Sequence, residues 1–330
     1  MRKLRIPALG ALALGAVAVS LLAGRFELSP GDIVSILFGK CEESIKAAVF
    51  LKIRLPRTLM AALAGAALSL AGWVYQSIFM NTLVSPDVLG VSGGCSIGAI
   101  AAILAGLPAA LIQTFSLVSG LAAVGITLLL ARAIGRHGNV SMLLSGIVVG
   151  ALANSVIMLL KYTADPTGEL SAIEYWLMGS FHAADWSRVI SMLTVVLPGC
   201  IAALLISQPV RLLSLGDDEA AALGVPVAPV KYAALISATA MVAGVVSVAG
   251  SVSWLGLIVP HVCRISGGET RATPVEVCLA GAFLLTVADL LARTLTSGEI
   301  PISILTSFMG AVFLLVLLVN RGLRSGRRLT

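Results

Sequence analysis

Residues 140–162, VSMLLSGIVVGALANSVIMLLKY, decide the fold class of this chain because the stretch holds a single charged side chain, Lys161. A helix needs about 20 mainly apolar residues to cross the hydrocarbon core of a bilayer, so the stretch predicts a membrane span. Gly146, Gly150 and Asn154 recur every four residues, which places them on one face of that helix. Small residues there permit close approach of another helix. Simple packing within the chain is the alternative to a role in a pathway.

Nine further apolar stretches share that character. Together with the first one they cover residues 8–24, 58–80, 91–107, 109–134, 140–162, 187–207, 228–249, 252–266, 274–296 and 302–320. Of the 330 residues, 58% are hydrophobic and 12% are charged, against about 25% charged in an ordinary soluble domain. So few charges exclude a disordered chain and a basic nucleic-acid binder, and they argue against a soluble enzyme. The sequence predicts an all-α polytopic membrane protein of about ten transmembrane helices, forming a single domain over residues 1–330.

Basic residues gather at both ends of the chain. They are Arg2, Lys3 and Arg5 at the N-terminus and Arg321, Arg324, Arg327 and Arg328 at the C-terminus. By the positive-inside rule both termini are cytoplasmic, which requires an even number of spans. Residues 8–24 also have the character of a cleaved signal peptide, but the many spans that follow favour a retained first helix.

Two short segments predict an internal repeat. Val88-Leu89-Gly90-Val91 and Trp254-Leu255-Gly256-Leu257 open the third and the eighth predicted spans. Because they lie five spans apart, the two halves would be inverted in the membrane, an organisation typical of transporters. After the fifth span, about residues 170–184 predict a short interfacial helix on the outer side, anchored by nearby tryptophans.

The loop after the sixth predicted span contains a short cytoplasmic helix, over about residues 212–224. A capping sequence opens it, three acidic residues fill its first turn, where negative charge suits the helix dipole, and alanines follow. So short a helix is marginal alone, so we expect it to pack against another surface, with a solvated connector as the alternative. The residues that carry this prediction are Ser214, Leu215, Gly216, Asp217, Asp218, Glu219, Ala220, Leu223 and Gly224.

Charged residues also gather at the opposite side. Arg54, Arg57 and Arg293 lie at the outer ends of the second and ninth predicted spans. Three guanidiniums on one face can receive carboxylates from an external partner, and ordinary snorkelling is the alternative. Asp289 lies deep in the ninth span, where an ionisable group is a functional candidate. Because Arg293 is four residues further on, we expect a structural ion pair rather than a proton relay.

Metal and nucleotide motifs are missing from the sequence. His261 follows Pro260 in the eighth span and is interpreted as structural, because no second metal ligand lies near it. The cysteines, which are Cys41, Cys95, Cys200, Cys263 and Cys278, form no C-x-x-C pair, so no zinc site or disulfide framework is predicted. The chain has no G-x-x-x-x-G-K-[ST] motif, so an ATP-driven protein of this kind needs its ATPase on a separate chain.

Four blocks of the sequence resemble the FecCD-like permease subunits of type II ABC importers, the iron-siderophore, haem and vitamin B12 family. The blocks are Arg54-Leu55-Pro56-Arg57-Thr58-Leu59; Asn81-Thr82-Leu83 through Pro86-Asp87-Val88-Leu89-Gly90-Val91-Ser92-Gly93-Gly94; Leu212-Leu213-Ser214-Leu215-Gly216 through Gly224-Val225; and Gly256-Leu257-Ile258-Val259-Pro260-His261. Their order and spacing make the resemblance specific over about residues 50–320. There are two departures: Thr82 replaces the usual proline, and Glu219 replaces a small residue.

The resemblance implies ten spans per subunit, a homodimer or pseudo-dimer, and a pathway along the dimer axis. Two ATPase subunits dock on the cytoplasmic loops and hold ATP and Mg, while this chain binds no cofactor of its own. A periplasmic or lipid-anchored binding protein delivers the cargo. The family's motifs match a coupling helix at residues 217–224, docking positions at Arg54, Arg57 and Arg293, an inner gate at Asn81 and Leu83, and a pathway-lining helix that carries Gly146, Gly150 and Asn154.

The sequence thus predicts a non-catalytic permease of the bacterial cytoplasmic membrane, surrounded by lipid and with no nucleic-acid partner. Its cargo is a metal chelate, with a ferric siderophore favoured and haem or cobalamin open. Relatives of this shape also carry oxyanions. Two other functions stay open: an ion-coupled secondary transporter with Asp289 as proton carrier, and an intramembrane hydrolase that uses a serine and His261.

Overall fold

Helices form the whole regular architecture in the computed structural model, which describes residues 4–39, 44–134, 138–266, 272–296 and 298–326. Within these ranges the all-α prediction is confirmed, and each of the ten predicted spans is a helix. They are α1 (Arg5–Leu22), α4 (Leu55–Ile78), α5 (Val91–Leu104), α6 (Ala109–Ala133), α7 (Asn139–Thr163), α9 (Trp186–Leu205), α12 (Val227–Ala249), α13 (Leu255–Ser266), α14 (Pro274–Thr294) and α15 (Ile302–Gly326). Cys41 and the basic residues Arg2, Lys3, Arg327 and Arg328 lie outside the described residues.

Seven helical stretches in the described chain are long and apolar enough to cross a membrane. They are α1, residues 45–78 including α4, α6, α7, α9, α12 and α14. The other three predicted spans, α5, α13 and the described apolar part of α15, are shorter apolar helices. Glycine or proline interrupts the regular helical path at two of these. The helix α5 begins after Gly90, whose backbone is in the left-handed conformation, and α13 contains Pro260. Interrupted short helices beside full-length ones are a feature of transporter folds.

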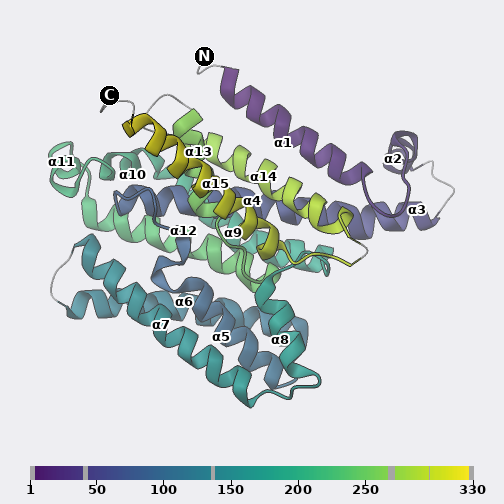
Figure 1. Ribbon diagram of the computed structural model, residues 1–330, viewed down its shortest axis with the longest axis horizontal. Coiled ribbons are helices and arrows are strands. Elements are labelled where there is room, and N and C mark those ends of the chain that lie inside the picture. Colours follow the sequence, from purple (N-terminus) through teal and green to yellow (C-terminus); the bar gives the residue numbers. More distant parts are fainter. Residues whose placement is uncertain (1–3, 40–43, 135–137, 267–271, 297, 327–330) are drawn as a thin grey trace.

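The centre of the molecule is built around α4 and α12, the most deeply buried of the long helices. Close backbone contact explains how α4 packs so tightly. A methyl group on Gly72 would lie 1.8 Å from the carbonyl oxygen of Gly256 in α13, and one on Gly65 would lie 2.2 Å from the carbonyl oxygen of Gly281 in α14. Only glycine allows two helices to approach so closely, as is typical of helix packing in membranes. Figure 1 shows α4 running through the middle of the bundle, with α14 and α12 beside it.

Shorter elements cap both ends of the bundle. At one end lie α2 (Pro30–Leu37), α3 (Ser44–Ala48), a π-helical segment (Val49–Arg54) and α8 (Glu169–Met178). At the other end lie α10 (Ser207–Leu213) and α11 (Asp217–Ala222), as Figure 1 shows. The predicted interfacial helix at about 170–184 is shorter in the structure, because Gly179 turns the chain with φ +66°. The predicted helix at about 212–224 is likewise divided into the end of α10, a turn and α11.

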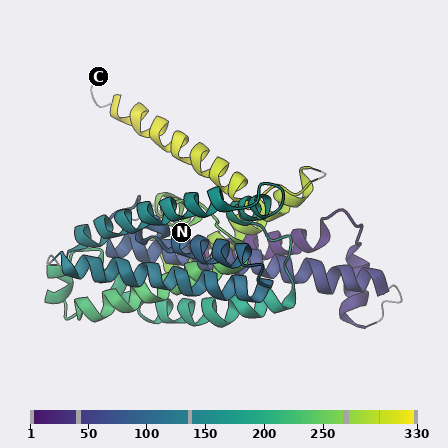
Figure 2. The same ribbon diagram turned by 90° about the horizontal axis from the view of Figure 1, so that it is seen from below.

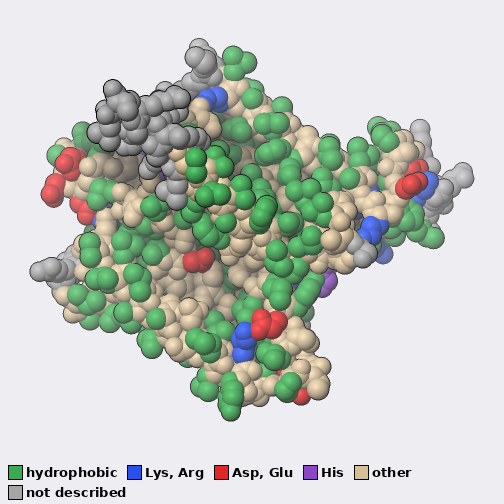
Figure 3. Space-filling view, in the orientation of Figure 1, with side chains coloured by type: hydrophobic (Ala, Val, Ile, Leu, Met, Phe, Trp, Pro, Cys, Tyr) green, Lys and Arg blue, Asp and Glu red, His purple; other side chains and the backbone are tan. Residues whose placement is uncertain are grey.

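Two long helices leave apolar side chains uncovered. α7 exposes a stripe that includes Leu144, Ile147, Leu152 and Met158, and α15 exposes Phe308. In Figure 2, α15 projects away from the rest of the bundle rather than lying along it. Figure 3 shows hydrophobic side chains over most of one face, with acidic groups gathered over α11. Exposed apolar helix faces in a membrane protein contact lipid or another subunit.

Candidate functional site

The short helix α11 has one packed face and one open face. The chain turns into it at Gly216, whose φ of +130° is a conformation that favours glycine. Ala220 is fully buried against the bundle, whereas Asp218, Glu219 and Leu223 are exposed. The predicted helix therefore packs on the bundle, and its other face leaves two acidic groups and a leucine exposed.

A buried lysine ties α11 to the membrane helices. Lys231 of α12 is 4% exposed, and its Nζ donates to Asp217 Oδ2 at 2.6 Å and to Asn139 Oδ1 at 2.9 Å. Asn139 starts α7, and its Nδ2 donates to the carbonyl oxygen of Ile78 at the end of α4, at 2.8 Å. The ammonium group of Lys231 thus links α12 to α11 and α7, and Asn139 extends the connection to the end of α4. We call Asp217, Lys231 and Asn139 the inner node.

Neither Lys231 nor Asn139 belongs to a motif that the sequence displays. The available signal was a lysine near the start of the apolar stretch 228–249, where a charge is costly unless it is paired. Its partner Asp217 was identified, but as part of an acidic first turn. A sequence cannot show that residues 139, 217 and 231 meet, because the contacts join separate helices.

The predicted inner-gate residues form a tight turn next to this node. Asn81 Oδ1 accepts a hydrogen bond from the N–H of Leu83 at 2.9 Å. This turn holds Leu83 60% exposed, so its side chain is free to contact another surface. The side chain of Asn81 stabilises the turn, even though Thr82 stands where the family tends to have proline.

The three predicted pathway residues of α7 differ in their surroundings. Gly146 is buried, and a methyl group there would lie 2.0 Å from the carbonyl oxygen of Val88. Gly150 has nothing within 4 Å of such a group, and Asn154 is exposed. Gly146 therefore serves packing within the chain, while Gly150 and Asn154 lie on the uncovered part of α7. A role for these two in a pathway stays a prediction.

The three outer arginines are buried and bonded within the chain. Arg54, Arg57 and Arg293 are 4%, 7% and 8% exposed. The guanidinium of Arg54 donates to the carbonyl oxygens of Leu21 and Leu22, at 2.9 and 2.6 Å. These donors are used for holding α1 against α4. A role in receiving carboxylates from another protein stays a prediction, and it would require the side chains to leave these internal partners.

Asp289 forms the expected ion pair with Arg293 and a closer one, which sequence analysis did not predict, with Arg57. Arg57 Nη2 lies 2.9 Å from Asp289 Oδ1, and its Nη1 lies 2.8 Å from Glu299 Oε1. Arg293 Nε is 3.7 Å from Asp289 Oδ2, and Arg293 also donates to the hydroxyl and carbonyl oxygens of Ser20. The pair with Arg57 was not predicted because Arg57 meets Asp289 across the α4–α14 contact, which sequence spacing cannot show. We call Arg57, Asp289, Arg293 and Glu299 the outer cluster.

The remaining structural candidates also lie inside the bundle. Pro260 and His261 are buried in α13, and the His261 ring packs edge-on against Phe313 of α15, with 5.9 Å between centroids. Cys95, Cys200, Cys263 and Cys278 are free thiols. Among the described residues, no three histidine, cysteine or carboxylate side chains are grouped so that they would hold a metal ion.

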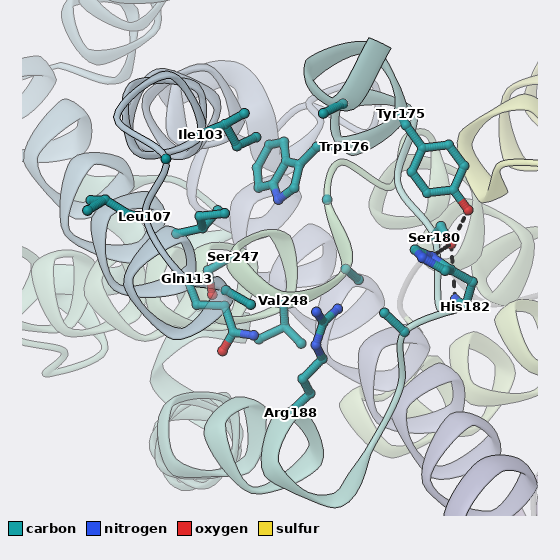
Figure 4. Close-up of a pocket in the computed structure, with 17 residues that line it drawn as sticks. Ile103, Leu107, Gln113, Tyr175, Trp176, Ser180, His182, Arg188, Ser247 and Val248 are labelled. Carbon is teal, nitrogen blue, oxygen red and sulfur yellow. Dashed lines mark hydrogen bonds between the residues drawn. The ribbon is translucent and has the colours of Figure 1, made fainter. Parts of the chain in front are cut away.

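A pocket of about 470 Å³ lies at the end of the bundle opposite α11. The end of α5, the start of α6, α8, the start of α9 and the end of α12 line it. Figure 4 shows the Arg188 side chain extending into it, between Gln113, Trp176 and His182. Partial burial lowers the pKa of His182, the charge of Glu299 opposes this, and Arg188 and Arg57 reinforce it. His182 is therefore neutral at neutral pH, and Arg188 supplies the charge of this pocket.

These features define a polytopic helical membrane protein of transporter type, with short helices interrupting the bundle and a short peripheral helix tied to the spans. The chain belongs to the FecCD transport family, which it matches over residues 12–320. Its relatives in this family are membrane permeases of ABC importers. The chain is thus the permease component of such an importer.

Three relatives and one solved structure document this membership, and a second solved structure shares the fold alone. The molybdate import system permease MolB of Haemophilus influenzae is 34% identical and aligns over 89% of this chain and 88% of its own length. The vitamin B12 permease BtuC of Citrobacter koseri is 37% identical (96% and 94%), and the hemin permease HmuU of Yersinia pestis is 37% identical (84% and 85%). A structure described as an inward-facing metal-chelate type ABC transporter has a TM-score of 0.87 at 31% identity, covering 97% of this chain and all of that one. PsaBC from Streptococcus pneumoniae, with a TM-score of 0.57 at 12% identity over 86% and 94% of the two chains, shares the fold.

Proposed function

We propose that this permease imports a bulky metal chelate through alternating access at the axis of a homodimer. The observation that carries the proposal is the inner node, because it joins a helix with an exposed acidic face directly to α12, α7 and α4. A permease needs such a joint if work done on a peripheral helix is to move membrane helices.

The cargo that we favour is a ferric siderophore, with haem or cobalamin as the next candidates. Relatives are named for vitamin B12, hemin and molybdate, and the most similar fold among the reported structures is described as metal-chelate type. The exposed part of α7 carries small and apolar groups together with the polar side chains of Asn154 and Ser155, which suits weak contacts with a large cargo. A pathway of this kind binds its cargo weakly, so that the cargo can leave.

We propose one kind of partner for each end of the bundle. Two ATPase subunits, which hold ATP and Mg, would dock on α11, and a periplasmic or lipid-anchored binding protein would approach the opposite end. A second copy of this chain would cover the exposed stripe of α7. Both termini would face the cytoplasm of a bacterial cell, in the cytoplasmic membrane, as the basic residues at the chain ends suggest.

In this mechanism the chain makes no covalent change to its cargo. Each contact of the inner node transmits movement from one helix to the next. Closure of the ATPase dimer would press on the exposed face of α11. The charge-assisted bond between Asp217 and Lys231 passes the movement to α12, and Asn139 passes it to the start of α7 and the end of α4. The two subunits would then rock about the dimer axis and open the mouths alternately.

The test reverses the charge of the exposed face while leaving the inner node intact. We expect Asp218→Lys with Glu219→Lys to abolish association with the ATPase or its stimulation by cargo, measured on the reconstituted complex. Glu27→Lys, at an exposed acid of the opposite end, is the matched control and should couple normally. Normal coupling by the double variant would contradict the proposal.

The secondary-transporter alternative finds little support at Asp289. Its side chain is 1% exposed and bonded to Arg57 and Arg293, so it is a fixed partner rather than a carrier with access to both sides. That alternative requires transport without any ATPase and its loss in Asp289→Asn. Labelling of a serine by a fluorophosphonate probe would support the hydrolase alternative.

A further inference from the structure

Two arginines line a second pocket, at the end of the bundle that carries α10 and α11 (Figure 1). The pocket has a volume of about 260 Å³ and lies between the end of α4, α10 and the end of α13. Arg211 belongs to α10 and Arg264 to α13, and none of the described residues that line the pocket is acidic. Two guanidiniums beside one space, with no carboxylate to neutralise them, favour an anion as the ligand.

Arg264 is held in place by a buried amide. Its Nη2 donates to Oε1 of Gln76, whose side chain is 3% exposed. The Gln76 Nε2 donates in turn to the carbonyl oxygens of Gly256 and Leu257, at 3.3 and 3.2 Å. Among the described residues, the Nε and Nη1 atoms of Arg264 form no hydrogen bond, so they remain available to a ligand. A guanidinium that is already oriented loses less freedom when it binds.

Arg211 has no partner within the described part of the chain. Its guanidinium forms no hydrogen bond or ion pair there, although the side chain is half-buried. The carboxylate of Asp217, six positions further on, is bonded to Lys231 instead. In the outer cluster, by contrast, the guanidinium of Arg57 is bonded to two carboxylates. A half-buried charge with unused donors can therefore gain a ligand here without first losing an internal bond.

The charge and polarity of the pocket favour a phosphate group. A phosphate monoester carries more than one negative charge at neutral pH and has three strong acceptor oxygens, so it can bond to two guanidiniums at once. A carboxylate carries a single charge and would neutralise only one of them. Three hydroxyl-bearing residues, Ser77, Thr82 and Ser214, also line the pocket and suit a ligand with several oxygens.

We propose that this pocket binds a phosphate group, either inorganic phosphate or a monoester, between Arg211 and Arg264. The ligand joins α10, which leads into α11, to α13 and to the turn after α4. Thr82 belongs to that turn and precedes the exposed Leu83, so a bound phosphate also restrains the predicted inner gate. The site itself does not depend on the proposed function, because only the pocket and its charges carry it.

The experiment measures the melting temperature of the full-length permease over a range of inorganic phosphate concentrations, without ATPase or nucleotide. A ligand of the folded state raises the melting temperature, so phosphate should stabilise the wild type, and sodium chloride at equal ionic strength should not. Arg211→Gln should weaken phosphate binding by about tenfold or more, and Arg211→Lys should weaken it less.

Two controls accompany these variants. Because Arg211 has no internal partner, Arg211→Gln should melt like the wild type when phosphate is absent. Arg132→Gln removes an exposed cation outside the pocket, beside Tyr232 near the start of α12, and should change phosphate binding by no more than about twofold.

Native mass spectrometry of the same samples distinguishes the two sources of the phosphate group. Phosphatidic acid that is retained by the wild type and lost in Arg211→Gln identifies a lipid headgroup, whereas a phosphate effect on lipid-free wild type identifies free phosphate. The proposal is overturned if folded Arg211→Gln responds to phosphate as the wild type does, if chloride acts equally, or if the wild type binds neither ligand. In that last case, a loss of ATPase affinity in Arg211→Gln would assign the pocket to the ATPase interface.

Discussion

The inner node and the outer cluster are both buried ionic contacts, but they join different kinds of elements. The outer cluster pairs two arginines with two acids and ties the long helices α4 and α14 to each other and, through Ser20, to α1. The inner node uses one lysine to hold a short peripheral helix whose other face is open. An ionic contact between two deeply packed helices holds them in fixed positions. An ionic contact to a peripheral helix can instead transmit a movement of that helix to the bundle. We therefore infer that the outer cluster is structural and that the inner node is a mechanical joint.

Breaking the outer cluster should give the largest effect on stability. Arg57→Met leaves Asp289 buried with only the longer contact to Arg293, at 3.7 Å. Removing one partner of a buried ion pair costs about 3–5 kcal/mol. We expect a large drop in melting temperature and in the yield of purified protein.

A double variant distinguishes the charge from the packing. Arg57→Met with Asp289→Leu replaces the pair by apolar groups, and stability should recover in part because no unpaired charge remains. An unchanged melting temperature in the single variant would show that the cluster does not stabilise the fold.

Breaking the inner node should change coupling more than stability. Lys231→Met leaves Asp217 at 40% side-chain exposure, where water can solvate it, so the loss of stability should be about 1–2 kcal/mol. The ATPase should still bind α11, whose open face is unchanged, but cargo-stimulated ATP hydrolysis and uptake should fall together. Assembly is measured by size-exclusion chromatography and coupling by ATPase assays in proteoliposomes. Full uptake by an assembled Lys231→Met complex would contradict the role of the node.

The helices of this fold are largely predictable from sequence, because membrane spans need long apolar runs and glycine or proline ends them. All ten stretches are helices, and their bounds differ from the prediction by a few residues, apart from α15, which extends to Gly326. The exposed acidic face of α11 also follows from its local pattern. The sequence pattern within one helix is enough to predict the position of a residue when that position depends only on its own helix.

Contacts between helices were not predictable in the same way. The spacing of Asp289 and Arg293 suggested their pairing, yet Arg57, 232 positions away, is the closer partner. Lys231 and Asn139 carried no motif, and Arg188 was one basic residue among several. In each case the outcome depends on which side chains packing brings together and which it leaves apart, and that is a property of the folded chain.

Glu299→Gln should weaken the outer cluster without breaking it. Glu299 contacts Arg57 at 2.8 Å but keeps 32% of its side-chain surface exposed, so its ion pair is partly screened. We expect a loss of stability of about 1 kcal/mol or less, well below that of Arg57→Met. Melting temperatures of the two variants in the same detergent measure the difference. A loss as large as that of Arg57→Met would show that Glu299, rather than Asp289, is the main partner of Arg57.

The smallest effects should separate Asp217 from its neighbour Asp218 on the same helix. Asp217→Asn replaces the charge-assisted bond to Lys231 by a neutral hydrogen bond, which should cost about 1 kcal/mol and reduce coupling severalfold. Asp218 is exposed, so Asp218→Asn should change stability by less than about 0.5 kcal/mol and leave coupling within about twofold. Both substitutions remove one negative charge from the same turn, so a general electrostatic effect on the ATPase would affect them equally. A larger coupling defect in Asp217→Asn therefore reports the bond to Lys231 itself, and equal defects would mean that α11 acts through its charge alone.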